Sequence, residues 1–112
     1  MAYERLKKYL TLENLWIYII KLLSEAPNGE MYAYEIKKAL HVQFGLRPAT
    51  VTVYSVLYRM EKEGLLQSRS TGTGLGRLSK RYYTVTDKGM RELQQAVDFI
   101  DEVRSKLQMT KG

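Results

Sequence analysis

The chain has 112 residues, 45% of them hydrophobic and 27% charged, with a formal net charge of +6; these values are typical of one folded domain and unlike those of a disordered chain. It contains no cysteine and a single histidine, His41, which excludes disulfides and Cys/His zinc sites. A Ser-His-Asp triad would have to be built on His41 alone, so we expect no enzyme, metal or cofactor. The basic balance favours a polyanionic partner, and the lack of cysteine fits a reducing cytoplasm.

The first predicted element is a helix over residues 11–26. Its apolar residues recur every three or four positions, but Ile17 and Ile20 also fill the other side, so the helix needs cover on more than one side and we expect a second copy of the chain to supply part of it. The apolar run 15–20 is far shorter than the ~20 residues that span a bilayer, and no signal-peptide pattern precedes it. We therefore expect a cytoplasmic protein with no membrane partner.

A short amphipathic helix is predicted at 32–44, after the turn residues 27–29. Gly45 is expected to close it, and Pro48 suits the first turn of a following helix, because proline has no N–H to lose there.

The next segment, about 49–63, is predicted to be a helix. Residues 50–54 alternate as a strand would, but Val53, Leu57 and Met60 continue at helical spacing and Gly64 stands at a C-cap position.

Two short strands, 66–70 and 81–85, are predicted to form a hairpin. The connection between them, 71–80, is rich in glycine and basic residues, yet it matches neither a dinucleotide-binding nor a Walker A pattern and precedes a strand. We expect a hairpin tip that reaches DNA phosphates or a minor groove rather than a nucleotide site.

A final helix is predicted from Asp87 to about Met109, with Thr86 as its N-cap. Such a helix is roughly 34 Å long at 1.5 Å per residue, longer than a small domain can cover. We expect its apolar stripe to pack against a symmetry mate and against the 12–23 region, with these dimerisation residues: Leu12, Trp16, Ile20, Leu93, Val97, Ile100, Val103 and Leu107.

This order of elements predicts a mainly α (α+β) fold: a winged helix-turn-helix with a two-stranded β-wing and a long C-terminal dimerisation helix. Residues 1–86 would form the DNA-binding part and 87–112 the dimerisation helix, within one compact domain.

The predicted second helix of the motif has two faces suited to a major groove. On a helical wheel Val53, Val56, Leu57 and Met60 face inward, with Val51, Ser55, Tyr58, Arg59 and Lys62 opposite. Between Arg47 and Tyr83 there are seven basic residues and two acidic ones, which favours nucleic-acid contact over an ordinary solvated surface. The expected DNA-binding residues are Tyr34, Lys38, Thr50, Thr52, Ser55, Tyr58, Arg59, Lys62, Arg77, Lys80 and Arg81.

Three blocks of the chain, 31–36, 52–65 and 80–89, resemble the signature blocks of PadR-type transcriptional regulators. The resemblance implies a winged-helix repressor that dimerises through its C-terminal helix and releases DNA when a small molecule binds or conditions change. The single C-terminal helix is similar to that of the compact subfamily, some of whose members bind flat aromatic drugs at the dimer interface. Three positions depart from the family pattern and bear on the operator more than on the fold: Ala33, Val51 and residues 78–79.

The function that follows is a sequence-specific, double-stranded-DNA-binding transcriptional regulator, a homodimeric repressor on a pseudo-palindromic operator. One alternative is a winged-helix protein-interaction or RNA-binding module without operator specificity. Another, compatible with the first, is a sensor that binds a small aromatic effector at the dimer interface. Trp16 and nine tyrosines permit it, although aromatic residues at helical spacing are more often packing groups.

Overall fold

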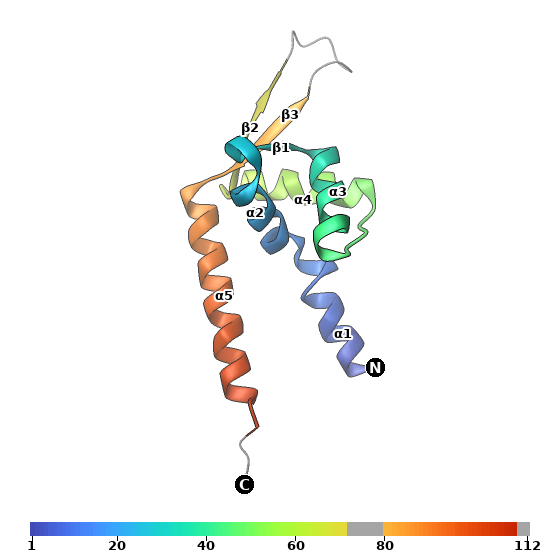
Figure 1. Cartoon of the computed structure of the whole chain (residues 1–112), viewed down its shortest axis with the longest axis vertical. Helices are drawn as coiled ribbons and strands as arrows, with labels where there is room; N and C mark the ends of the chain where they lie inside the picture. Colours follow the sequence, from blue (N-terminus) through green and yellow to red (C-terminus); the bar gives the residue numbers. More distant parts are fainter. Residues whose placement is uncertain (72–79, 110–112) are drawn as a thin grey trace.

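The computed structural model describes residues 1–71 and 80–109 and has the predicted winged-helix architecture (Figure 1). Two 3₁₀ turns, η1 and η2, occur beside the helices and strands. In chain order the elements are α1 (Ala2–Tyr9), η1 (Leu12–Asn14), α2 (Leu15–Glu25), η2 (Pro27–Gly29), β1 (Met31–Tyr32), α3 (Ala33–Phe44), α4 (Thr50–Lys62), β2 (Leu66–Ser70), β3 (Arg81–Val85) and α5 (Asp87–Leu107).

The core is built around α2. Ile19, Ile20 and Leu23 are fully buried, because α3, α4, α5 and β3 all contact this helix. One chain thus covers this helix from several directions, while Trp16, Ile17 and Tyr18 stay half-buried; cover from a second copy stays a prediction. The helix also begins at Leu15 rather than at 11, because a 3₁₀ turn precedes it and Asn14 is non-helical at φ −138° and ψ 50°.

The turn between α3 and α4 is built from residues with distinct backbone roles. Gly45 closes α3 as predicted, at φ +69° in the left-handed region that glycine adopts at little cost. The placement of Pro48 in the first turn of the next helix is wrong. Ala49 is still extended, at φ −64° and ψ 152°, so α4 begins at Thr50 and the buried Pro48 lies before it.

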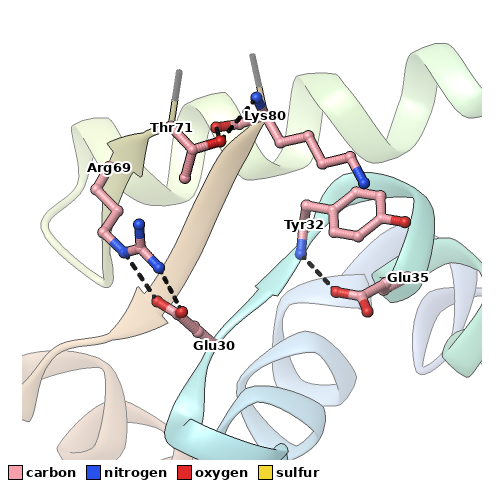
Figure 2. A network of polar contacts seen from close by, with 6 residues as sticks. All are labelled: Glu30, Tyr32, Glu35, Arg69, Thr71 and Lys80. Carbon is pink, nitrogen blue, oxygen red and sulfur yellow. Dashed lines mark hydrogen bonds and ion pairs between the residues drawn. The ribbon is translucent and has the colours of Figure 1, made fainter. Parts of the chain in front are cut away.

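The predicted hairpin is present, with Leu66 opposite Val85 and Ser70 opposite Arg81. It belongs to a three-stranded antiparallel sheet in the order β1-β3-β2, and the two-residue strand β1 was not predicted. Tyr32, expected in a helix, instead pairs with Tyr82 across the sheet, and its backbone N–H donates to Glu35 Oε1 at 3.1 Å, which starts α3 one residue later (Figure 2).

The start of α5 is fixed to the end of α4. Thr86 is the predicted N-cap: its Oγ1 accepts from the Gly89 N–H at 3.0 Å and donates to the Gly64 carbonyl at 2.6 Å. Gly89 itself lies against the backbone of Leu65, where a Cβ would come within 2.5 Å of the carbonyl oxygen. The helix ends at Leu107, two residues before the predicted end.

The N-terminal helix α1 was not predicted and has no buried residue. Figure 1 shows α1 and the distal part of α5 extending from the body at the end opposite the hairpin. Both helices carry large apolar side chains in solvent, including Leu6 at 55% and Ile100 at 42% exposure.

Candidate nucleic-acid interface

The exposed face of α4 carries the side chains that the sequence places opposite the core. Val53, Leu57 and Met60 anchor the helix and are at most 1% exposed, which fixes the opposite face outward. That face forms a shallow hollow lined by Val51, Tyr54, Ser55, Tyr58, Arg59 and Lys62. The Lys62 ammonium lies 5.4 Å from the centroid of the Tyr58 ring, a distance at which cation and ring attract.

A hydrogen bond joins the first turn of α4 to α3. Lys37 Nζ donates to Thr50 Oγ1 at 2.8 Å, across 13 residues of sequence. Lys37 also lines a hollow of about 480 Å³ beside the α3–α4 turn, with Tyr34, Lys38, His41, Leu46, Arg47 and Pro48. The cations Lys37, Lys38 and Arg47 therefore lie near the N-terminal end of α4. The positive end of the helix dipole also attracts phosphate there.

A second group of polar contacts fixes the base of the hairpin (Figure 2). Arg69 on β2 donates from Nε and Nη2 to the two carboxylate oxygens of Glu30, at 3.1 and 2.5 Å. This hydrogen bonding lowers the pKa of Glu30 below its ordinary value of 4.5 and raises that of Arg69, so both groups stay charged at neutral pH. The Arg69 guanidinium also lies 5.0 Å from the centroid of the Tyr82 ring.

Further along the hairpin, the side chain of Lys80 lies over the aromatic ring of Tyr32. The Lys80 ammonium lies 4.2 Å from the centroid of the Tyr32 ring, as Figure 2 shows from close by. Thr71 and Lys80 close the described part of the hairpin through the Thr71 N–H, which donates to the Lys80 carbonyl at 2.8 Å.

A cleft of about 470 Å³ lies between α3, α4 and the hairpin. It is lined by Tyr32, Ala33, Tyr34, Tyr54, Ser70, Lys80, Arg81 and Tyr83. Arg81 is oriented by Ser68, to whose Oγ its Nη1 donates at 2.9 Å, and Ser68 in turn donates to Glu61 at 2.7 Å. Burial raises the pKa of Tyr83, so this phenol stays neutral. The cleft thus combines aromatic faces with two cations, a combination that suits the backbone and bases of a nucleic acid.

Ten of the eleven residues predicted to contact DNA are described, and all ten are exposed. They fall into three adjoining groups: Tyr34 and Lys38 on α3, the six residues of α4, and Lys80 and Arg81 at the start of β3. Tyr34 lines both the α3 hollow and the cleft, which joins the first group to the third. Arg77 lies outside the described residues.

The predicted dimerisation residues range from exposed to fully buried within one chain. Leu12, Val97, Ile100 and Leu107 are between 42% and 74% exposed, and Trp16 and Val103 are half-buried. Leu93 packs against the core. Ile20 is 0% exposed within one chain and offers no surface to a second, so its assignment to a dimer interface is wrong.

Sequence reasoning missed four residues of this surface: Lys37, Tyr54, Arg69 and Glu30. Tyr54 could have been found from the helical wheel, since it is 54% exposed on α4. The other three form contacts across long stretches of sequence: Lys37 with Thr50, 13 positions away, and Arg69 with Glu30, 39 positions away. No local sequence pattern indicates such contacts.

Within residues 1–71 and 80–109, no group of three or more His, Asp or Glu side chains is arranged to hold a metal ion. None of the described helices is both long and apolar enough to cross a bilayer.

The family model described as the transcriptional regulator PadR-like family matches residues 19–95. Comparison with curated proteins finds no match.

Several solved structures share the fold. A PadR family transcriptional regulator from Eggerthella lenta is 28% identical, with a TM-score of 0.66 and 98% of this chain and 99% of that chain covered. A transcriptional regulator from Clostridium thermocellum is 22% identical, with a TM-score of 0.72 over 93% and 94% of the two chains. The PadR of Bacillus subtilis, solved in complex with operator DNA, is 24% identical, with a TM-score of 0.65 over 91% of this chain and 51% of that one.

Proposed function

The chain belongs to the PadR-like family of transcriptional regulators, and from this premise we propose that it is a homodimeric repressor that binds a pseudo-palindromic operator in double-stranded DNA. The observation that carries the proposal is the exposed face of α4, flanked by cations of α3 on one side and of the hairpin on the other. A helix anchored on its inner face and flanked in this way can enter a major groove while the cations meet the phosphates on either side.

We assign two roles to the residues of this surface. Thr52, Ser55 and Arg59 on α4 reach base edges, because they are exposed on the helix that enters the groove. The remaining side chains position the protein on the backbone: Tyr34, Lys37, Lys38, Thr50, Tyr58, Lys62, Lys80 and Arg81.

The dimer is proposed from the apolar surface that one chain leaves in water. Val97, Ile100 and Leu107 recur at three- to seven-residue steps along α5 and are 43%, 42% and 74% exposed, as in a helix that packs against another helix. On α1, Leu6 and Tyr9 are 55% and 57% exposed. A two-fold dimer would cover both helices and set two copies of α4 about one DNA turn, ~34 Å, apart.

A small aromatic effector is proposed to bind near Trp16. This side chain lines a cavity of about 310 Å³ between η1, α4 and α5, together with Arg59, Glu63 and Glu92. Arg59 lies in the last turn of α4, Glu63 directly follows this helix, and Glu92 lies on α5. A ligand in this cavity would therefore change the packing between the proposed DNA-reading helix and the proposed dimerisation helix. Trp16 is the only tryptophan, so quenching of its fluorescence reports binding directly.

With double-stranded DNA as the partner, we propose a cytoplasmic location.

Titration of a duplex pool and of an RNA hairpin at several salt concentrations tests the proposed function. Preference for the duplex with a steep fall in affinity as salt rises supports it, because each phosphate neutralised adds about 0.9 to the salt slope. Equal binding of the hairpin, or no salt dependence, would favour an RNA-binding or protein-interaction module instead.

A further inference from the structure

Val51 is an aliphatic side chain left in solvent on the face of α4 that we propose enters DNA. It is 71% exposed and lies in the first turn, on one stripe with Ser55 and Tyr58, four and seven residues further along the helix. It lines the same shallow hollow as Arg59 and Lys62. Val51 is neither a core residue nor one of the partly buried residues packed against the core.

The polar side chains of the first part of α4 have little capacity to distinguish bases. Residues 50–58 contain no Asn, Gln, Asp or Glu, so they cannot pair bidentately with adenine or accept a hydrogen bond from the amino group of cytosine. Their hydroxyl groups bond to several bases alike, and that of Thr50 already accepts from Lys37 at 2.8 Å.

The major groove offers one apolar group, the C5 methyl of thymine, which aliphatic side chains can contact. Arg59 and Lys62, which line the same hollow further along α4, are exposed cations. They match a phosphate-flanked groove better than an apolar protein surface.

We infer that Val51 reads thymine, by packing its methyl groups against the C5 methyl of a thymine at a fixed position in each operator half-site. This inference rests on the proposed function and adds the class of base that α4 selects. It makes Val51 a specificity-determining residue in addition to Arg59, whose guanidinium can read guanine.

Deoxyuridine tests this directly, because it differs from thymidine only by the missing methyl. The starting probe is a duplex that the wild-type chain selects from a random pool. A set of duplexes is then made from it, each with deoxyuridine in place of one thymidine. At one position per half-site, the loss of the methyl should weaken wild-type binding about fourfold. Val51→Ala should bind the thymidine duplex more weakly and respond to that deoxyuridine by less than about 1.5-fold, because the partner of the methyl is gone.

Val42→Ala is the matched control, since Val42 is 70% exposed on α3 and should keep the wild-type sensitivity to deoxyuridine. Alanine is a better helix former than valine, so a weaker Val51→Ala complex cannot be attributed to a lost helix.

Equal wild-type affinity for every deoxyuridine duplex would overturn the inference while leaving operator binding intact. A Val51→Ala variant as sensitive to deoxyuridine as the wild type would overturn it too, because another residue would then contact the methyl. If no duplex is enriched from the pool, the proposed function fails and the inference fails with it.

Discussion

Arg69 and Glu30, 39 residues apart in the sequence, form a two-pronged ion pair, with Nε to Oε2 at 3.1 Å and Nη2 to Oε1 at 2.5 Å. Figure 2 shows that this pair connects strand β2 to the segment before β1. The planar guanidinium fits both oxygens at once, a geometry that lysine cannot reproduce. The pair therefore fixes the base of the wing against the part of the chain that leads into α3.

The pH dependence of stability should reveal this ion pair. The folded state lowers the pKa of Glu30 below its ordinary value of 4.5, so the unfolded chain takes up this proton first as the pH falls. The stabilisation by the pair is present above the ordinary pKa and is lost as the pH falls through the lowered one.

Glu30→Gln should accordingly be less stable than the wild type at neutral pH, with a difference that shrinks as the pH falls below about 4.5. Urea unfolding of both proteins between pH 7 and pH 3 measures the difference. Arg69→Met removes the same pair and should show the same trend. A difference between wild type and Glu30→Gln that does not change over this range would show that the pair adds nothing to stability.

The residues of the hairpin should act on all DNA sequences alike. Lys80→Ala and Arg81→Ala are each expected to weaken binding to every duplex and to lower the salt slope by about one or less, because phosphate contacts position a protein without specifying sequence. Lys106→Ala is the control, since Lys106 pairs with Glu102 in the last turns of α5, a helix that extends away from the hairpin (Figure 1). Unchanged affinity in both hairpin variants would remove the wing from the interface.

Thr52 and Arg59 should behave differently. At whichever of the two contacts a base edge, replacement by alanine is expected to cost about 1–3 kcal/mol of binding free energy on the preferred operator and to change the operator preference. Binding of a panel of single-base operator variants measures both effects. A uniform loss across the whole panel would contradict direct readout by these side chains.

The double substitution Ile100→Asp with Leu107→Asp should give a monomer and abolish operator binding. Both side chains are exposed in one chain, at 42% and 74%, so the folded body should persist while a charge enters the proposed helix-helix contact. Sedimentation measures the oligomeric state and circular dichroism the fold. A double variant that stays dimeric would contradict this account of the interface.

The sequence was sufficient to predict the parts of the fold that are coded locally. The helical spacing of Val53, Leu57 and Met60, the left-handed Gly64 at φ +81° and the Thr86 cap are each visible within a few residues. The exposed face of α4 was predicted for the same reason, because its residues lie opposite the buried Val53, Leu57 and Met60.

Much of the rest was not predictable because it depends on contacts between residues that are distant in the sequence. The strand β1 is two residues long and exists through pairing with Tyr82 and Tyr83. The helix α1 is eight residues long and buries nothing in one chain, so no contact with the core accompanies its exposed apolar residues Leu6 and Tyr9. Ile20 was assigned to a dimer because the sequence does not indicate how many neighbours surround α2.

Two copies of this chain are proposed to read an inverted pair of half-sites in double-stranded DNA. Sequencing of duplexes that the wild-type protein selects from a random pool measures this arrangement. The enriched sequences should contain two inverted half-sites with centres about 10 base pairs apart, one turn of the duplex. Enrichment of a single asymmetric site, or no enrichment over the starting pool, would contradict it.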